Sequence, residues 1–140
     1  KRKQEKQAGV VERISEMNRI ISITVNQSIT MMRNEYHIEE RQKNGNKKYY
    51  AVIKEGENEL KAKRKKIEIN GKDIDLLINA LKEIEIKICP DYIFGLDGMT
   101  TTITIEQGFN KATYQWWGEI PEQWKALDKI FAFFDDIKKK

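Results

Sequence analysis

Hydrophobic and polar residues alternate along several stretches of the chain, a period typical of β-strands. The alternation starts in "RIISITV" (19–25), resumes after Asn26 and runs through Met31 toward Ile38. It returns in "KKYYAVIKE" (47–55) and in the short segment "KIEIN" (66–70). The dipeptide Asn44-Gly45 lies between two of these segments and favours a tight hairpin turn. The first half of the chain is therefore predicted to form antiparallel strands.

The second half shows the same plan. "YIFGL" (92–96), "TTITIE" (101–106) and "TYQWW" (113–117) are predicted strands. Asp97-Gly98 separates the first two and predicts a second hairpin turn. The strands of the two halves are thus expected to form two meanders.

Helical spacing follows each set of strands. Asn70 is a suitable N-cap for the first helix, and Pro121 lies in the first turn of the second, where a missing N–H costs nothing. The apolar stripes are Ile74, Leu77, Ile78, Leu81 and Ile84 in the first helix and Trp124, Leu127, Phe131 and Phe134 in the second. Near the start of the chain, Val10, Ile14, Met17 and Ile21 share this spacing and predict a short N-terminal helix.

These elements define an α+β domain over residues 10–140, with an antiparallel sheet built from two meanders and both main helices packed on one face. Residues 1–9 are charged, lack a core pattern and are expected to form a flexible polar tether. The predicted core comprises Ile74, Leu77, Leu81, Ile103, Ile105, Trp116, Leu127, Phe131 and Phe134.

Composition narrows the class of protein. A chain of 140 residues is the size of one domain, and its single cysteine, Cys89, excludes a framework of intramolecular disulfides. Residues 1–72 hold 18 Lys/Arg against 10 Asp/Glu, a net charge of +8, whereas residues 73–140 hold 8 against 12, a net charge of −4. The basic first half favours an anionic partner.

The densest basic run is "KAKRKK", in which Lys61, Lys63, Arg64, Lys65 and Lys66 are candidate anion-binding residues. No aromatic residue interleaves with them, so nucleic acid is not the expected ligand. The alternative is a solvated segment: charge on both faces predicts an edge strand or a protruding turn, where cations oppose strand-to-strand aggregation.

Three residues are candidates for contact with a protein or peptide partner. Adjacent strand residues point to opposite faces, so Tyr114 and Trp116 are expected under the last helix, and Trp117 shares the other face with Gln115. Trp117 and Gln115 are therefore candidate contact residues, and Tyr49 is a third. The alternative for the tryptophans is a packed corner of the core, to which Trp124 is assigned.

The sequence offers no recognisable catalytic arrangement. His37 and Cys89 are the only residues of their types, too few for a zinc site of the usual ligands, and they are expected to lie too far apart to form a hydrogen bond. Adjacent carboxylates such as Glu39 and Glu40 diverge on a strand. No catalytic residue, metal or cofactor is predicted, and the chain is expected not to be an enzyme.

Two stretches resemble a widespread group of small bacterial proteins without assigned function, some of them similar to envelope lipoproteins. They are "SITMMRNEYHIEE" (28–40) and "LDGMTTTITIEQGFNKATYQWWGEIPEQWKAL" (96–127). The resemblance covers about half of the chain and rests on a strand entering Asp-Gly, an alternating strand, a turn and a Pro-started helix. It implies an α+β fold and a bacterial source, and it transfers no catalytic residue.

Three functions follow as hypotheses. The first is a non-enzymatic binding module of the bacterial envelope that recognises a protein or peptide, contacts a membrane only through a removed N-terminal anchor, and is a candidate homodimer. The second is a cytoplasmic protein of the toxin-immunity kind, using an acidic face against a basic toxin. The third is anion or nucleic-acid binding through Lys61–Lys66.

Overall fold

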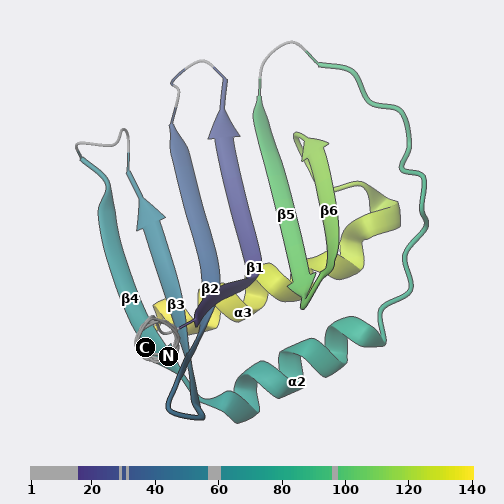
Figure 1. Ribbon diagram of the computed structural model, residues 1–140. Coiled ribbons are helices and arrows are strands. Elements are labelled where there is room, and N and C mark those ends of the chain that lie inside the picture. The colour runs from purple at the N-terminus through teal and green to yellow at the C-terminus, as the bar shows by residue number, and fades with distance from the viewer. Residues whose placement is uncertain (1–15, 29, 31, 57–60, 96–97) are drawn as a thin grey trace, which may run out of the picture.

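The computed structural model describes residues 16–28, 30, 32–56, 61–95 and 98–140 (Figure 1). Six strands and two helical segments make up this part of the chain. The strands are β1 (Glu16–Gln27), β2 (Arg33–Lys43), β3 (Asn46–Glu55), β4 (Lys63–Ile69), β5 (Met99–Gln107) and β6 (Asn110–Trp117). Helix α2 (Gly71–Lys82) follows β4, and the 3-10 helix η1 (Glu122–Leu127) leads directly into α3 (Asp128–Lys138) after β6.

All six strands belong to one antiparallel sheet in the order β4-β3-β2-β1-β5-β6. β5 pairs with β1, so the strands of both halves of the chain join in the middle of the sheet. The fold is therefore α+β, as the sequence predicted.

The start of the described chain differs from the prediction. Met17 and Ile21 lie in β1 and are not helical, while Val10 and Ile14 fall outside the described residues, as does the expected tether. β1 is hydrogen-bonded to β2 on one side and β5 on the other, and this pairing overrides the helical spacing of a few apolar residues. The long segment expected to continue from Asn26 toward Ile38 instead reverses between Gln27 and Arg33, where the Gln27 N–H donates to the Met32 carbonyl over 2.9 Å.

One predicted hairpin is confirmed and the other is wrong. Asn44 and Gly45 have φ of 53° and 79° and connect β2 to β3, the left-handed pair that such a turn requires. Residues 92–95 form no strand, so no hairpin precedes β5, and Asp97 itself is outside the described residues. Gly95 and Gly98 instead pack against the Trp117 indole, where any side chain on either glycine would collide with the ring.

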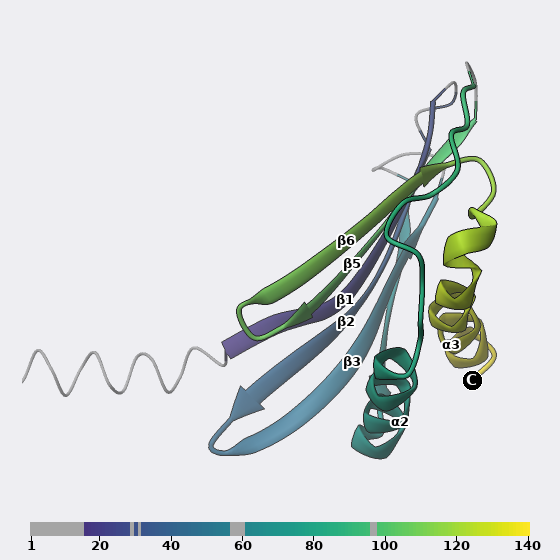
Figure 2. The same ribbon diagram turned by 90° about the vertical axis from the view of Figure 1, so that its right-hand side faces the viewer.

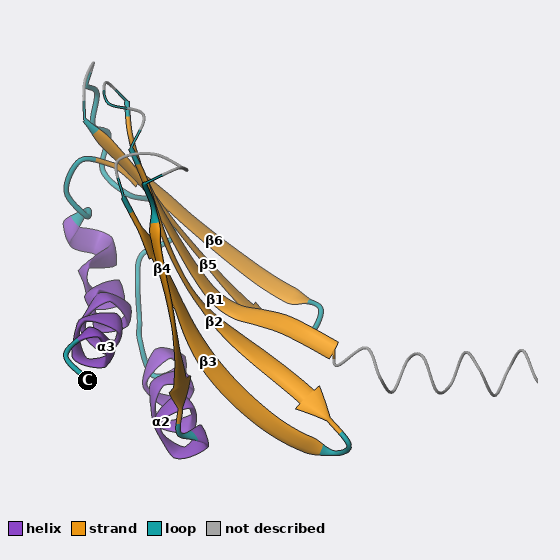
Figure 3. Ribbon diagram, turned by 90° about the vertical axis from the view of Figure 1, so that its left-hand side faces the viewer, coloured by secondary structure: helices purple, strands orange, loops and turns teal. Residues whose placement is uncertain are grey.

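Both helices lie on the same side of the sheet, and no described element covers the other face, which we call the open face (Figures 2 and 3). The Asn70 side chain accepts a hydrogen bond from the Lys72 N–H and so caps α2 as predicted. Trp124 belongs to the core, and its ring meets Tyr114 and Trp116 edge-on at 5.5 and 6.4 Å between centroids. Ile74, Leu77, Ile103, Trp116, Leu127 and Phe134 of the predicted core are buried, and Leu81, Ile105 and Phe131 pack against it half-buried.

Candidate functional site: a groove between the two helices

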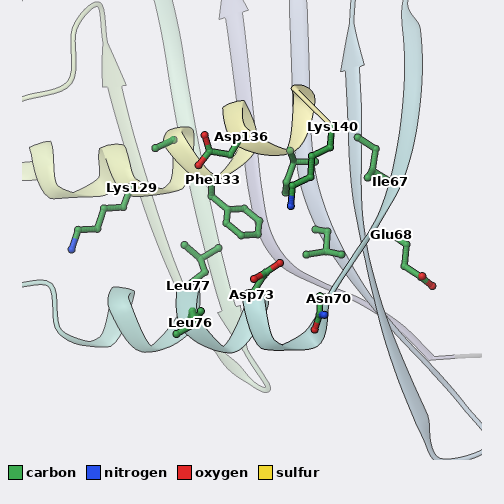
Figure 4. A pocket seen from close by; sticks show the side chains of 13 residues that line it. Ile67, Glu68, Asn70, Asp73, Leu76, Leu77, Lys129, Phe133, Asp136 and Lys140 are labelled. Atoms are coloured by element: carbon green, nitrogen blue, oxygen red, sulfur yellow. The ribbon is translucent and has the colours of Figure 1, made fainter.

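A cleft of about 710 Å³ separates α2 from α3 above the β4 side of the sheet (Figure 4). We call it the interhelical groove. Residues of three elements line it: Ile67, Glu68, Ile69 and Asn70 at the end of β4, Asp73, Leu76 and Leu77 of α2, and Lys129, Ala132, Phe133, Asp136, Ile137 and Lys140 of α3 and its end. Its size lies within the range of 300–1,000 Å³ that is typical of small-ligand pockets.

The apolar wall of the groove comes from residues that adjoin the buried helix stripes. Leu77 and Phe134 face the core, and their neighbours Leu76 and Phe133 widen each stripe toward the space between the helices. Phe133 points from α3 toward Leu76 and Leu77 of α2 (Figure 4). Leu76 is 68% exposed, a large apolar side chain that this fold leaves in water.

Charged side chains surround this apolar wall. Asp73 projects from α2, Asp136 and Lys129 from α3, and Lys140 from the end of the chain (Figure 4). Within the described ranges, none of these four side chains forms an ion pair. The groove therefore offers an apolar surface bordered by charges of both signs.

A second group of polar side chains, which contact one another, lies on the open face of the sheet. The spacing of two along β2 places His37, Glu39 and Arg41 on one face, and the register brings Tyr50 and Lys66 beside them from β3 and β4. His37 Nε2 lies 2.9 Å from Glu39 Oε1, and Arg41 Nε and Nη2 each lie 3.1 Å from Glu39 Oε2. Lys66 Nζ lies 3.9 Å from the same oxygen and 4.6 Å from the centre of the Tyr50 ring. We call His37, Glu39, Arg41 and Lys66 the open-face cluster.

Burial determines the protonation of His37, whereas hydrogen bonds and neighbouring charges determine that of Glu39. Burial lowers the pKa of His37 and outweighs the hydrogen bond to Glu39, while Arg19 and Arg64 lower it further. Burial alone would raise the pKa of Glu39, but the bonds from His37 and Arg41 together with their charges lower it instead. At neutral pH, Glu39 is ionised and His37 is neutral, so the pair holds one negative charge against two cations.

A third polar contact ties the end of α3 to the sheet. The Tyr36 hydroxyl donates to Glu55 Oε2 over 2.8 Å, and Lys138 Nζ donates to the same oxygen over 3.1 Å. Lys138 Nζ also lies 4.6 Å from the centre of the Tyr36 ring. Burial, followed by the bond to Glu55, raises the pKa of Tyr36 far above its usual range. This tyrosine remains protonated and acts as a structural donor.

The structure separates the three residues proposed for partner contact. Trp117 is half-buried beneath Gly95 and Gly98 and so supports the chain that precedes β5. Gln115 is exposed on the open face and accepts from the Thr102 hydroxyl over 3.2 Å. Tyr49 is half-buried on the helix side, where a methyl group added to Gly71 at the start of α2 would lie 3.7 Å from its ring. They form no common surface, and none of them lines the interhelical groove.

The basic run occupies an edge of the sheet, as the sequence predicted. Lys63, Arg64, Lys65 and Lys66 belong to β4, the terminal strand, and all are exposed. Lys61 precedes the strand and is exposed as well. Because Lys66 reaches over Tyr50 toward Glu39, at least one of these cations has a structural partner on the open face.

The two residues considered for nucleophilic chemistry have separate partners. His37 bonds to Glu39, whereas Cys89 is exposed and its Sγ lies 3.6 Å from the Pro90 carbonyl oxygen. Over the described part of the chain, no group of three or more His, Cys, Asp or Glu residues is placed to hold a metal ion. Neither described helix has the length and apolar character needed to span a bilayer.

The chain matches no known family model and no curated protein. The fold and the site thus define it only as an α+β protein with a single antiparallel sheet and an apolar groove between its two helices.

Two features of the site were missed in the sequence. The first is the open-face cluster, which the alternation of His37, Glu39 and Arg41 in "HIEER" could have indicated, because strand spacing places these three residues on one face. Leu76 and Phe133, each beside a stripe residue, also widen the apolar face beyond what one contact with a sheet needs. No pattern in the sequence indicates that these two positions face each other.

Proposed function

We propose that the protein is a non-enzymatic binding module that holds a segment of a protein or peptide in the interhelical groove. The observation that carries this proposal is the exposure of Leu76 beside Leu77 and Phe133 in an apolar cleft. Burying apolar surface is the dominant favourable contribution to protein association, and aromatic and aliphatic groups in pockets contribute most of it.

The groove favours a ligand with apolar side chains flanked by charges. Asp73 and Asp136 can accept from basic side chains or an amino group, and Lys129 and Lys140 can pair with acidic ones. Such rim charges contribute orientation and association rate more than affinity. A short amphipathic helix or an extended segment meets both requirements.

The test is selection of peptides from a displayed library against the purified protein, followed by affinity measurement for the selected peptides. Leu76→Asp and Phe133→Ser should each weaken binding at least tenfold, because they place polar atoms in the apolar wall. Ile88→Ser removes an equally apolar side chain that is 98% exposed and outside the groove, so it should leave the affinity unchanged. Peptides that bind all three variants as tightly as the original protein would reject the groove as the site.

We further propose the bacterial envelope as the setting, supported by the resemblance to envelope lipoproteins. The immunity-type hypothesis requires a continuous acidic face, whereas the groove carries Lys129 and Lys140 beside its carboxylates. Fractionation of cells that express the full-length gene discriminates the two: recovery in the cytosol would favour the immunity hypothesis.

Anion binding through Lys61–Lys66 is a second candidate, supported by the exposure of Lys63, Arg64 and Lys65 along β4. Binding to phosphate backbones should weaken steeply with salt, by about 0.7–0.9 log units per log of salt for each phosphate neutralised. A titration with nucleic acid at low and moderate salt tests it. Tight binding that survives moderate salt and is lost on changing Lys63, Arg64 and Lys65 to Ala would rank this function above the groove.

A further inference from the structure

The two edge strands of the sheet, β4 and β6, differ in charge. β4 carries four consecutive cations, which oppose pairing with another strand. β6, at the other edge, has no charge from Ala112 to Trp117 and contains Thr, Tyr and Trp, which favour strands. An uncharged edge of this kind is a template for pairing with a further strand.

The register of the β5–β6 hairpin shows which groups of β6 point outward. Gln107 pairs with Asn110 across the Gly108-Phe109 turn, and the Gly118 N–H donates to the Met99 carbonyl over 2.8 Å. Hydrogen-bonded pairs alternate in an antiparallel ladder, so the even-numbered residues from 110 to 116 bond to β5. The main-chain groups of Lys111, Thr113 and Gln115 therefore point away from the sheet.

Exposed apolar side chains lie at both ends of this edge. Phe109, in the turn that begins β6, is fully exposed. The segment 87–95 packs first on η1 and then on the far end of β6: the Trp124 indole donates to the Lys87 carbonyl over 2.9 Å, the Gln123 side-chain amide donates to Asp91, and Gly95 packs on Trp117. This segment exposes Ile88, Tyr92, Ile93 and Phe94. Apolar side chains gathered in this way mark an interaction surface.

We propose that β6 pairs antiparallel with β6 of a second copy of this chain, which makes one continuous sheet across a two-fold axis. The arrangement that pairs outward-pointing groups symmetrically places Thr113 opposite itself and Lys111 opposite Gln115, so no like charges meet. It also places Phe109 of each copy opposite Trp117 of the other, beside the apolar segment 87–95.

This complementarity identifies the second copy as the occupant of the edge. Phe109 and the apolar segment lie at opposite ends of β6, and a two-fold axis brings them together twice. The contact is isologous, so it closes as a dimer and does not extend into a fibre. The proposal is independent of the interhelical groove, which lies at the β4 side of the sheet.

The test is site-directed cross-linking of the full chain in a Cys89→Ser background, since Cys89 is an exposed thiol. Two hydrogen-bonded partners on antiparallel strands have Cα atoms about 5.5 Å apart, within the 4.4–6.8 Å that a disulfide spans. Thr113→Cys should therefore form a covalent dimer rapidly under mild oxidation. Lys111→Cys is the matched control: it is equally exposed on β6, but its symmetry mate is about 14 Å further along the pair.

A second measurement follows the oligomer without cross-linking. Light scattering across a concentration series should show a dimer, which Thr113→Lys should shift to monomer by opposing two ammonium groups at the axis. Thr24→Lys adds the same charge to the open face in the sheet interior and should leave the dimer intact. A wild-type monomer at all concentrations, equal cross-linking of the two cysteine variants, or a dimer that persists in Thr113→Lys would each overturn the proposal.

Discussion

Replacing Glu39 by alanine tests whether the open-face cluster stabilises the fold. Glu39 is 2% exposed although neither of the described helices lies on its face of the sheet. Its two oxygens accept from His37 at 2.9 Å and from Arg41 at 3.1 Å, and Lys66 lies 3.9 Å away. Alanine removes the acceptor for all three groups and leaves the β2 backbone unchanged.

The three partners of Glu39 differ in their access to water, and this difference determines how much stability the substitution should cost. The side chains of Arg41 and Lys66 are 37% and 42% exposed, so water can solvate both cations once the carboxylate is removed. The side chain of His37 is only 9% exposed, so its Nε2 loses its partner where water has little access. A buried polar group left unsatisfied costs about 1–3 kcal/mol, and we expect Glu39→Ala to lower the free energy of unfolding by about 2–3 kcal/mol.

Urea denaturation followed by circular dichroism measures this change, and the matching decrease in Tm is roughly 5–10 °C. Glu55→Ala is the control, because Glu55 also accepts two hydrogen bonds but is 44% exposed, and its loss should cost about 1 kcal/mol or less. A Glu39→Ala protein as stable as the wild type, or no less stable than Glu55→Ala, would refute the stabilising role of the cluster.

Three further predictions concern pH, the core and the segment before β5. Folding lowers the pKa of His37 below 6.5 and that of Glu39 below 4.5, so the unfolded chain binds protons more readily than the folded protein. The free energy of unfolding should therefore fall as the pH is lowered through 6.5, and fall again below 4.5. In denaturation curves of Glu39→Gln, the second of these decreases should be smaller. Phe134→Ala should lower the free energy of unfolding by about 3–5 kcal/mol, because Phe134 is 2% exposed and its ring centroid lies 5.9 Å from that of Tyr36. Phe131→Ala should lower it by less, because Phe131 is only half-buried. Equal losses of stability in urea denaturation would contradict this difference. Gly95→Ala should displace the segment before β5 from Trp117 and so increase acrylamide quenching of tryptophan fluorescence. Gly71→Ala, whose methyl group would lie 3.7 Å from Tyr49, should leave the quenching unchanged. Unchanged quenching in both variants would show that the segment does not cover the indole.

The sequence by itself determined most of the secondary structure. Period-two alternation identified the strand segments "RIISITV" and "TTITIE", and the Asn44-Gly45 turn followed from the positive φ that both positions require. The helix stripes placed Leu77 and Phe134 in the core, because such stripes need a sheet to cover them. The basic run was correctly assigned to an edge, since charge on both faces excludes the sheet interior.

Tertiary contacts decided the remaining features. The predicted strand 92–96 fails over its described residues because Gly95 and Gly98 pack on Trp117, a contact with a residue distant in sequence. The spacing of Met17 and Ile21 predicted a helix, but strand pairing on both sides of β1 requires an extended chain. The groove also depends on contacts between residues distant in sequence. Leu76 and Phe133 belong to two helices that are separated in the chain by β5 and β6, and the hydrophobic period within each helix does not indicate which residues of the other helix lie opposite.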